Sequence, residues 1–486
     1  MKVTVHNLGI IREAEIDLKP LTIFVGPNNA GKTWLAYALA GIFGPHGFGE
    51  YFQAYLEEKV PDTYALLDNA IEQVLSNGSA TFDLVQFAEE HGEIYFNNVA
   101  GFTRHWIAKF MSTEIASYEH LEISIDLAET KAGFLERVLS YSMRSEISGG
   151  RQKPSLSIRK RREERELFVY TSTQYASTED ASEERILEQL PADLIKEFLA
   201  RSVLLALHRA IFPHVRILPT ERTAYIAFPF GSRVVNKEQL TIEEISPQKR
   251  KTKATMGPVS SFMNMIQTTF KDVSVEREER AKSNLRIREY VQLAQLLEKQ
   301  ILSGEVNFSQ PELNLAQGLN QSDLDSAREI LFLPTKDVKV EISIASSMVK
   351  ELTPLVLYLR YVALPGELLI IDEPEMNLHP EAQAKIIEFL AMLVNAGLNV
   401  LITTHSPYVV DHLANLIKAA KNADKEAVSN EFYLKRKDAF ISQDKVSVYL
   451  VEDGQVKNAL DEDGVIQWNT FGEVSDRISE IYFTLR

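Results

Sequence analysis

The feature that most constrains the fold is a glycine-rich segment near the start of the chain, Gly26-Pro27-Asn28-Asn29-Ala30-Gly31-Lys32-Thr33. It matches the pattern G-x-x-x-x-G-K-[ST] and joins a short apolar strand, Leu21 to Val25, to an apolar helix from Trp34. Glycines let successive backbone N–H groups point at phosphate oxygens, and the helix adds its positive end. We therefore predict nucleotide binding by the whole segment, with Lys32 on the β- and γ-phosphates and Thr33 on Mg²⁺.

Paired acids at the end of a later strand form the second part of the predicted site. Leu368 to Ile371 is an apolar run that ends in Asp372-Glu373. Paired acids after a strand also occur in solvated turns, but here a turn bounded by prolines and a helix from about Glu381 follow. We expect Asp372 to hold Mg²⁺, and Glu373 to act as the general base for the attacking water.

Two further segments flank this strand in the sequence. Asn399 to Thr404 predicts another buried strand, and His405 at its end is expected to reach the γ-phosphate and orient the water. Upstream, Ser346 and Ser347 begin a helix with apolar residues at helical spacing. Serines at a helix start act either as caps or as a phosphate-binding end, and the sequence leaves both readings open.

With the segments GPNNAGKT, ASSMVKEL, LLIIDEPEMNLHP and TTHS in this order, the chain resembles the soluble ABC-type ATPases of the RecF, SMC and OLD-like group, within the AAA family ATPases. The resemblance implies an α/β P-loop NTPase, that is, an ABC-type head with a mixed sheet flanked by helices and mainly helical insertions. It implies ATP and Mg²⁺ as ligands, and a dimer in which Ser347 contacts the γ-phosphate bound to the other subunit, with Asn377-Leu378-His379 as the D-loop. Met348 replaces the glycine that usually follows the signature serine, which bears on the hydrolysis rate.

Two segments compete with these assignments. Ile147 to Gln152 is textually closer to an ABC signature, but a strand-like alternation follows it, so we expect a loop between strands. Val446 to Glu452 is similar to the first strand of the TOPRIM nuclease domain of OLD-type proteins, but no Asp-x-Asp strand follows. We expect Lys445 to Val451 and Gly454 to Lys457 to form a closing hairpin, and no nuclease activity from this polypeptide alone.

The motif-bearing segments predict one ATPase core that two insertions divide. The expected parts are core 1–50, a partly helical insertion with antiparallel strands over 51–212, core 213–230, a polar helical insertion over 231–327, and core 328–486. We expect helices over Tyr51–Leu75, Pro191–Phe212 and Glu276–Leu302, and strands over Leu121–Leu127 and Leu156–Tyr170. Glu221 and Arg222 follow the strand Val215 to Leu218, where a Q-loop-like role and a plain ion pair weigh equally.

Composition limits the partners. The 486 residues include 52 Lys+Arg and 68 Asp+Glu, a net charge of −16, which argues against wrapping nucleic acid over the whole surface. Two basic clusters fit either a solvated face or a local contact to DNA or an acidic partner: Arg151, Lys153, Arg159, Lys160, Arg161, Arg162 and Arg165, and Lys249, Arg250, Lys251 and Lys253. The absence of cysteine fits a cytoplasmic protein, and no apolar run reaches the length of a membrane span.

Three functions remain in competition. The first is an ATP-hydrolysing regulatory or sensor subunit, like the ATPase subunits of prokaryotic anti-phage systems of the Septu and PARIS types, with homodimers or larger homo-oligomers and a separate effector such as a nuclease. The second is a DNA repair or maintenance ATPase like RecF. The third is an ATP-bound scaffold that cages an effector with little turnover. A neighbouring nuclease gene would favour the first, and replication genes the second.

Overall fold

The computed structural model describes residues 1–60, 64–114, 116–148, 155–172, 191–227, 257–270, 274–309, 329–468, 477 and 479–484. The chain divides into two compact units. The first unit comprises Met1–Thr4, Ile42–Trp106 and Leu121–His214, and the second comprises Val5–Gly41, Ile107–His120 and Val215–Arg486. The five-part division expected from the sequence stays a prediction beside this two-unit description.

A mixed sheet forms the framework of the second unit, with the strand order β1-β2-β16-β15-β3-β14-β13-β9, and β1 has residues in both units. The strands are β1 (Lys2–Leu8), β2 (Ile11–Asp17), β3 (Leu21–Val25), β9 (Val215–Leu218), β13 (Leu368–Asp372), β14 (Asn399–Thr404), β15 (Val446–Glu452) and β16 (Gln455–Asn458). The five strands from β15 to β9 are parallel, and β16 is antiparallel to β15. The predicted mixed α/β fold is confirmed, and the structure also shows the expected closing hairpin as β15 and β16.

The central strands are apolar along their whole length because both faces are covered. Every residue of β3 and of β13 is buried, as is typical of parallel strands between helical layers. The register pairs Asp372 with Thr403, and Val25 with Thr404. The carboxyl ends of β3, β13 and β14 therefore lie at one edge of the sheet, where the loops after them meet.

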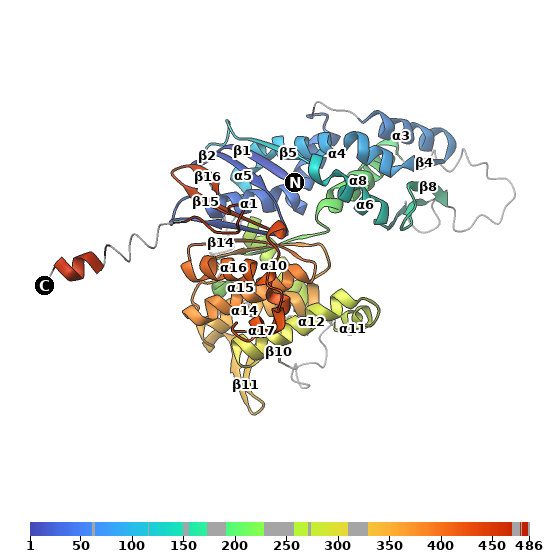
Figure 1. Ribbon diagram of the computed structural model, residues 1–486. Helices are drawn as coiled ribbons and strands as arrows, with labels where there is room; N and C mark the ends of the chain where they lie inside the picture. The colour runs from blue at the N-terminus through green and yellow to red at the C-terminus, as the bar shows by residue number, and fades with distance from the viewer. Residues whose placement is uncertain are drawn as a thin grey trace, which may run out of the picture. The chain divides into compact units, whose positions relative to one another are not determined.

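Helices of the second unit pack on this sheet, and α15 and α16 lie side by side (Figure 1). Proline occupies the first turn of both, at Pro380 and Pro407, where its missing N–H costs no hydrogen bond. The larger helices are α1 (Lys32–Phe43), α10 (Gly257–Phe270), α11 (Ser274–Ser283), α12 (Leu285–Leu297), α14 (Ser347–Leu357), α15 (Pro380–Asn395) and α16 (Pro407–Ala420). The shorter ones are α9 (Arg222–Ala227), α17 (Lys425–Ser429), η4 (Ile342–Ile344), η6 (Lys437–Ala439) and η7 (Gln443–Lys445), while α5 (Thr103–Phe110) has residues in both units.

The prediction of one long charged helix over Glu276–Leu302 is wrong, because the segment is divided. The chain forms α11, then α12, and then the π-helical turn η3 (Glu298–Leu302). Asn284 breaks the run, since its side chain accepts hydrogen bonds from the N–H groups of Arg286 and Ile287 and caps α12. A small antiparallel sheet follows, made of β10 (Glu305–Phe308), β11 (Ile330–Thr335) and β12 (Val338–Glu341).

The first unit combines helices with a four-stranded antiparallel sheet in the order β4-β8-β7-β6. The strands of this sheet are β4 (Ser79–Asp83), β6 (Met143–Ser148), β7 (Ser155–Lys160) and β8 (Glu166–Ser172). The strand β5 (Glu122–Asp126) also belongs to this unit but lies outside this sheet. Its helices are α2 (Pro45–Leu56), α3 (Ala65–Asn77), α4 (Leu84–Gly101), η1 (Ala128–Thr130), α6 (Lys131–Ser140) and α8 (Ala192–Ile211). The expected strand over Leu156–Tyr170 is two strands, because a turn between Lys160 and Glu166 reverses the chain.

The signature-like text ISGGRQ begins at the end of β6, and β7 follows it as the antiparallel neighbour. Its residues 149–152 lie outside the described residues. Among the described helices, none is long and apolar enough to cross a membrane.

Candidate active site

The glycine-rich loop lies between β3 and α1, in the strand–loop–helix order that the sequence predicts. Gly26 has φ +150°, and a Cβ there would meet the carbonyl oxygen of Val451 at 2.2 Å. Gly31 has φ +98°, and a Cβ would press on the side chain of Ile11 at 2.9 Å. Only glycine fits both positions, since each combines a left-handed backbone with a close neighbour. Between them, Pro27, Asn28 and Asn29 are exposed, and Ala30 is half-buried.

Lys32 folds back over this loop. Its Nζ donates hydrogen bonds to the carbonyl oxygens of Gly26 at 2.9 Å and Pro27 at 2.7 Å. Burial lowers the pKa of the ammonium, and the carboxylates of Glu373 and Asp372 act in the opposite direction. The ammonium therefore lies on the concave side of the loop, near the two acids. A phosphate bound there would give the ammonium a negatively charged partner, which the neutral carbonyl oxygens do not provide.

Asp372 at the end of β13 accepts three hydroxyl hydrogen bonds. Thr33 donates to its Oδ1 at 3.0 Å, Thr403 donates to the same oxygen, and Tyr37 donates to Oδ2 at 3.1 Å. Burial raises the pKa of the carboxyl, and the three hydroxyls act against that rise. Hydroxyl and carboxylate oxygens are the ligands that Mg²⁺ prefers, so the contact between Thr33 and Asp372 is one that the predicted metal site requires.

Glu373 and His405 meet above the same sheet edge. His405 Nδ1 lies 3.5 Å from Glu373 Oε1 and 3.9 Å from Glu375 Oε1. Glu373 has φ +50°, and its N–H donates to the carbonyl and hydroxyl oxygens of Thr403, each at 3.1 Å. The carboxylate of Glu373 is therefore presented by a left-handed backbone that the neighbouring strand holds.

Glu375 is a site residue that the sequence reasoning did not single out. Its Oε1 accepts hydrogen bonds from Thr404 Oγ1 at 2.6 Å and from the N–H of His405 at 3.0 Å. The side chain is 4% exposed, and burial raises its pKa. It fixes the backbone that carries His405, and the signal that was available is a third acid two residues after Glu373.

Arg222 bears on the choice between a Q-loop-like role and a plain ion pair in the turn after β9. Its guanidinium is buried, donates to the carbonyl oxygens of Asp372 at 2.6 Å and Glu373 at 2.8 Å, and pairs with Glu351 of α14. The residue is therefore neither an ion pair confined to its own turn nor a free sensor of the ligand. Glu221 beside it is exposed.

Ser347 is not brought to the loop within this chain. Ser346 is the cap of α14, with its Oγ accepting from the N–H of Val349 at 3.4 Å, while Ser347 is exposed in the first turn. Among the described residues, no hydrogen bond joins Ser347 to the segment from Gly26 to Thr33. Its predicted role depends on a second subunit and stays a prediction.

The basic clusters are only partly described. Lys160 was expected on a charged face, but it is buried, and its Nζ binds the carbonyl oxygens of Leu139, Tyr141 and Arg161 at 2.8 to 3.2 Å. The exposed members are Arg159, Arg161, Arg162 and Arg165, of which Arg161 pairs with Glu164 and Arg165 with Asp83. Arg151, Lys153 and the cluster from Lys249 to Lys253 lie outside the described residues.

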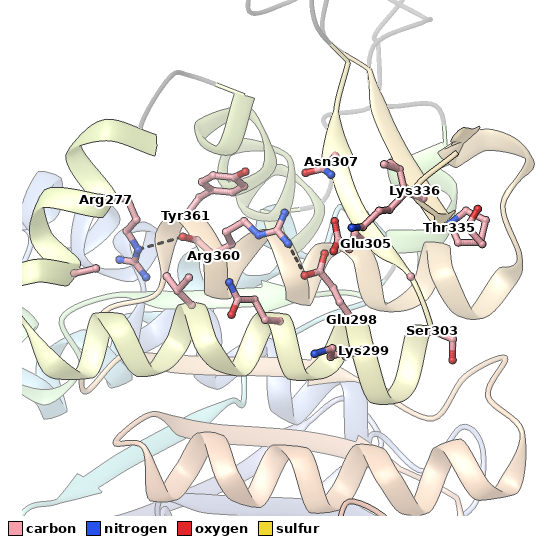
Figure 2. Close-up of a pocket in the computed structure, with 16 residues that line it drawn as sticks. Arg277, Glu298, Lys299, Ser303, Glu305, Asn307, Thr335, Lys336, Arg360 and Tyr361 are labelled. Atoms are coloured by element: carbon pink, nitrogen blue, oxygen red, sulfur yellow. Dashed lines mark hydrogen bonds and ion pairs between the residues drawn. The ribbon is translucent and has the colours of Figure 1, made fainter. Parts of the chain in front are cut away.

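A cavity of about 930 Å³ lies elsewhere in the second unit, among α11, α12, η3 and the small sheet (Figure 2). Its wall includes Arg277 and Arg360, whose guanidinium groups are already engaged. Arg277 donates to the carbonyls of Leu359 and Arg360, and Arg360 pairs with Glu298 at 2.5 Å. None of the predicted nucleotide-binding residues lines this cavity, so it is distinct from the loop site.

Residues 1–286, more than half of the chain, match the family described as "AAA ATPase domain". The chain belongs to this family. Residues 243–411 of the AAA ATPase chain match a second family, described as "AAA domain, putative AbiEii toxin, Type IV TA system". Both matches are to AAA domains, so the predicted membership of the AAA family ATPases is confirmed.

Three solved structures similar to this AAA ATPase chain are SMC heads. One is an SMC head bound to the C-winged helix domain of ScpA, with 13% identity, TM-score 0.35, and 94% of this chain and 96% of that chain covered. Another, from Pyrococcus furiosus, carries an extended coiled coil and is bound to the C-terminal domain of ScpA, with 12% identity, TM-score 0.33, and 99% and 98% covered. The third, from Thermotoga maritima, has 10% identity, TM-score 0.29, and 94% and 97% covered. No curated protein matches the chain.

Proposed function

We propose that the protein binds Mg·ATP at the glycine-rich loop and hydrolyses it to ADP and phosphate. The observation that carries this proposal is the convergence of Lys32, Thr33, Asp372, Glu373 and His405 at one sheet edge, from loops after β3, β13 and β14. Phosphoryl transfer needs positioning and charge stabilisation more than covalent chemistry, and this set supplies both.

Each side chain has a role that its contacts support. Lys32 and the loop N–H groups bind the phosphates, and Thr33 and Asp372 would hold Mg²⁺, which when bound neutralises charge on the β- and γ-phosphates. Glu373 accepts the proton of the attacking water. His405, which lies 3.5 Å from the Glu373 carboxylate, orients that water beside the γ-phosphate.

The complete site requires a second copy of the chain. Ser347 is exposed at the start of α14, where a helix N-terminus offers N–H groups and a positive end to an anion. ATP held between two heads would place this end on the γ-phosphate of the other subunit. The functional unit is then an ATP-sandwiched homodimer or a larger homo-oligomer built from such pairs.

In the cell, we assign the protein a regulatory or sensor role in a cytoplasmic anti-phage defence complex with a separate effector, such as a nuclease. The match to an AAA domain described as a putative AbiEii toxin of a type IV toxin–antitoxin system supports a connection to such systems. The insertions between the motif segments would recognise the trigger. A nuclease gene beside the coding sequence would support this role.

Two alternatives to the regulatory role are each favoured by a separate observation. The exposed arginines Arg159, Arg161 and Arg162 favour direct DNA contact, as in RecF-like repair ATPases, and predict binding that weakens steeply with salt. Met348 in place of the signature glycine favours a slowly hydrolysing, ATP-bound scaffold that cages an effector.

The deciding experiment compares phosphate release by the wild type and Glu373→Gln, with ATP binding measured in parallel. Glutamine keeps the size of the side chain but cannot accept the proton, so turnover should fall by about 10²–10⁴-fold while ATP remains bound. Wild-type phosphate release no faster than that of the variant would refute hydrolysis and favour the scaffold.

A further inference from the structure

A buried arginine holds the turn that carries the proposed catalytic acids. Arg222 is 1% exposed. Its Nη1 donates to the carbonyl oxygens of Pro219 at 2.8 Å and Asp372 at 2.6 Å, and its Nη2 donates to the carbonyl oxygen of Glu373 at 2.8 Å. The two acids thus contribute their backbones to this contact, while their carboxylates remain available to the site.

The backbone at Glu373 needs such support. Its φ of +50° is unfavourable for a residue with a Cβ and persists only where the surroundings determine it. The N–H of Glu373 is bound by Thr403, and its carbonyl is bound by Arg222. Removal of the guanidinium would release the carbonyl of Glu373 and leave its backbone held only through the N–H.

The partner of Arg222 lies on the helix that carries the signature-like serines. Glu351 of α14 is one turn beyond Ser347, and its carboxylate pairs with Arg222 in the protein interior. The other carboxylate oxygen of Glu351 accepts from Thr223 Oγ1 at 2.6 Å and from Asn377 Nδ2 at 3.5 Å. One buried carboxylate therefore joins α14, α9 and the turn after β13.

We propose that Arg222 and Glu351 are positioning residues, which hold the Glu373 backbone in its catalytic conformation and couple it to the first turn of α14. The proposal rests on the hydrolysis assigned to this site. A planar guanidinium binds three carbonyls and a carboxylate in a fixed arrangement that a lysine ammonium cannot reproduce. A ligand contact at Ser347 reaches Glu373 through this pair, so the base is aligned best when the signature end is engaged.

The same helix supplies a matched control. At its far end, α14 continues into the π-helical turn η5 (Tyr358–Val362), where Arg360 pairs with Glu298 at 2.5 Å and binds the Val306 carbonyl (Figure 2). This pair is also largely buried, but its partners lie in η3 and β10. The pair of Arg360 and Glu298 therefore serves as the control, because it is a buried arginine–glutamate pair with no described contact to the turn that carries Asp372 and Glu373.

The test uses double substitutions that remove both charges of a pair, because a buried ion pair can be replaced by apolar residues without loss of folding. Arg222→Met/Glu351→Met is expected to lower kcat by about 10²-fold through misplacement of Glu373, with the KM for ATP unchanged. Arg360→Met/Glu298→Met should keep both kinetic constants. Wild-type kcat in the folded first variant, or an equal loss in the second, would overturn the proposal.

Hydrogen exchange supplies a readout that does not depend on turnover. The backbone amides of Glu373 and of residues 375–378 should exchange faster in the Arg222/Glu351 double variant than in the wild type, and at the wild-type rate in the Arg360/Glu298 variant. Unchanged exchange overturns the positioning role. If the wild type releases no phosphate, the hydrolysis assignment fails, but the hydrogen-exchange measurement still tests whether Arg222 and Glu351 hold the Glu373 backbone. If the double variant does not fold, Glu351→Gln carries the same two measurements, because glutamine keeps the shape and removes the charge.

Discussion

The two units bury different chemistry. Among the described residues, the buried carboxylates all lie in the second unit: Glu298, Glu351, Glu367, Asp372, Glu375 and Glu388. The first unit instead buries a cluster of rings around His208, including Tyr51, Tyr95, Phe43 and Phe96. Its polar ring atoms pair mainly with one another, as in the contact of 2.6 Å between the hydroxyls of Tyr51 and Tyr64.

The difference shows how each unit obtains a defined structure. Carboxylates in the second unit fix turns and strand ends, since each accepts hydrogen bonds from groups that would otherwise be unpaired, and such groups are costly to expose to an apolar interior. Rings in the first unit fill volume and fix geometry through edge contacts. Both units have apolar cores, and the second unit, which performs the proposed chemistry, adds a set of buried carboxylates that the described part of the first unit lacks.

The largest expected effect is a loss of ATP binding, and it distinguishes two buried lysines whose ammonium groups both bind carbonyl oxygens. Lys32 caps the glycine-rich loop, and Lys160 caps a turn of the first unit. Lys32→Ala should abolish ATP binding in a fluorescent-nucleotide titration, whereas Lys160→Ala should bind ATP normally and lose about 1–3 kcal/mol of stability, because carbonyls are left unpaired. Undiminished ATP binding by Lys32→Ala would contradict the site assignment.

The next effect concerns stability. Glu388 of α15 is fully buried and accepts from His412 Nε2 at 2.7 Å and from the N–H groups of Tyr433 and Leu434. Glu388→Leu leaves these donors unpaired and should cost about 3–5 kcal/mol in urea denaturation. Phe96→Leu in the first unit removes ring contacts only and should cost roughly 1–2 kcal/mol. Equal losses of unfolding free energy in Glu388→Leu and Phe96→Leu would show that the buried carboxylate contributes no more to stability than the buried ring.

A further effect on stability depends on pH. Burial lowers the pKa of His208 to about 4, while its ring contacts the Tyr95 hydroxyl and the Gly44 carbonyl. The unfolded chain takes up a proton near pH 6.5 and the folded chain only near pH 4, so stability falls as pH drops through this window, by roughly 3 kcal/mol in total.

The measurement for this effect is the free energy of unfolding between pH 7 and pH 4. His208→Gln cannot take up the proton and should show a shallower loss of stability than the wild type across that window. His120→Gln changes an exposed histidine and should follow the wild-type curve. Parallel curves for wild type and His208→Gln would show that the His208 ring is not protected from protonation.

Local patterns predicted the strands and loops of the site because each depends on neighbours in sequence. The loop from Gly26 to Thr33 and the strands before Asp372 and His405 are of this kind. Arg222 and Glu351 are not, because a charged residue in a short turn or helix carries no local signal of burial, and the link from Thr223 to Glu351 spans 128 residues. The same reason explains Lys160, whose carbonyl partners are brought together by the antiparallel turn.

The position of β3 between β14 and β15 has a consequence during synthesis. The Thr22 hydroxyl contacts Ser447, which follows 425 residues later, and both strands that flank β3 come from the last part of the chain. At about 5–20 residues per second, a ribosome needs roughly 20–85 s to supply these neighbours. Until then, the apolar strand that leads into the phosphate loop lacks the two neighbours that flank it in the folded protein.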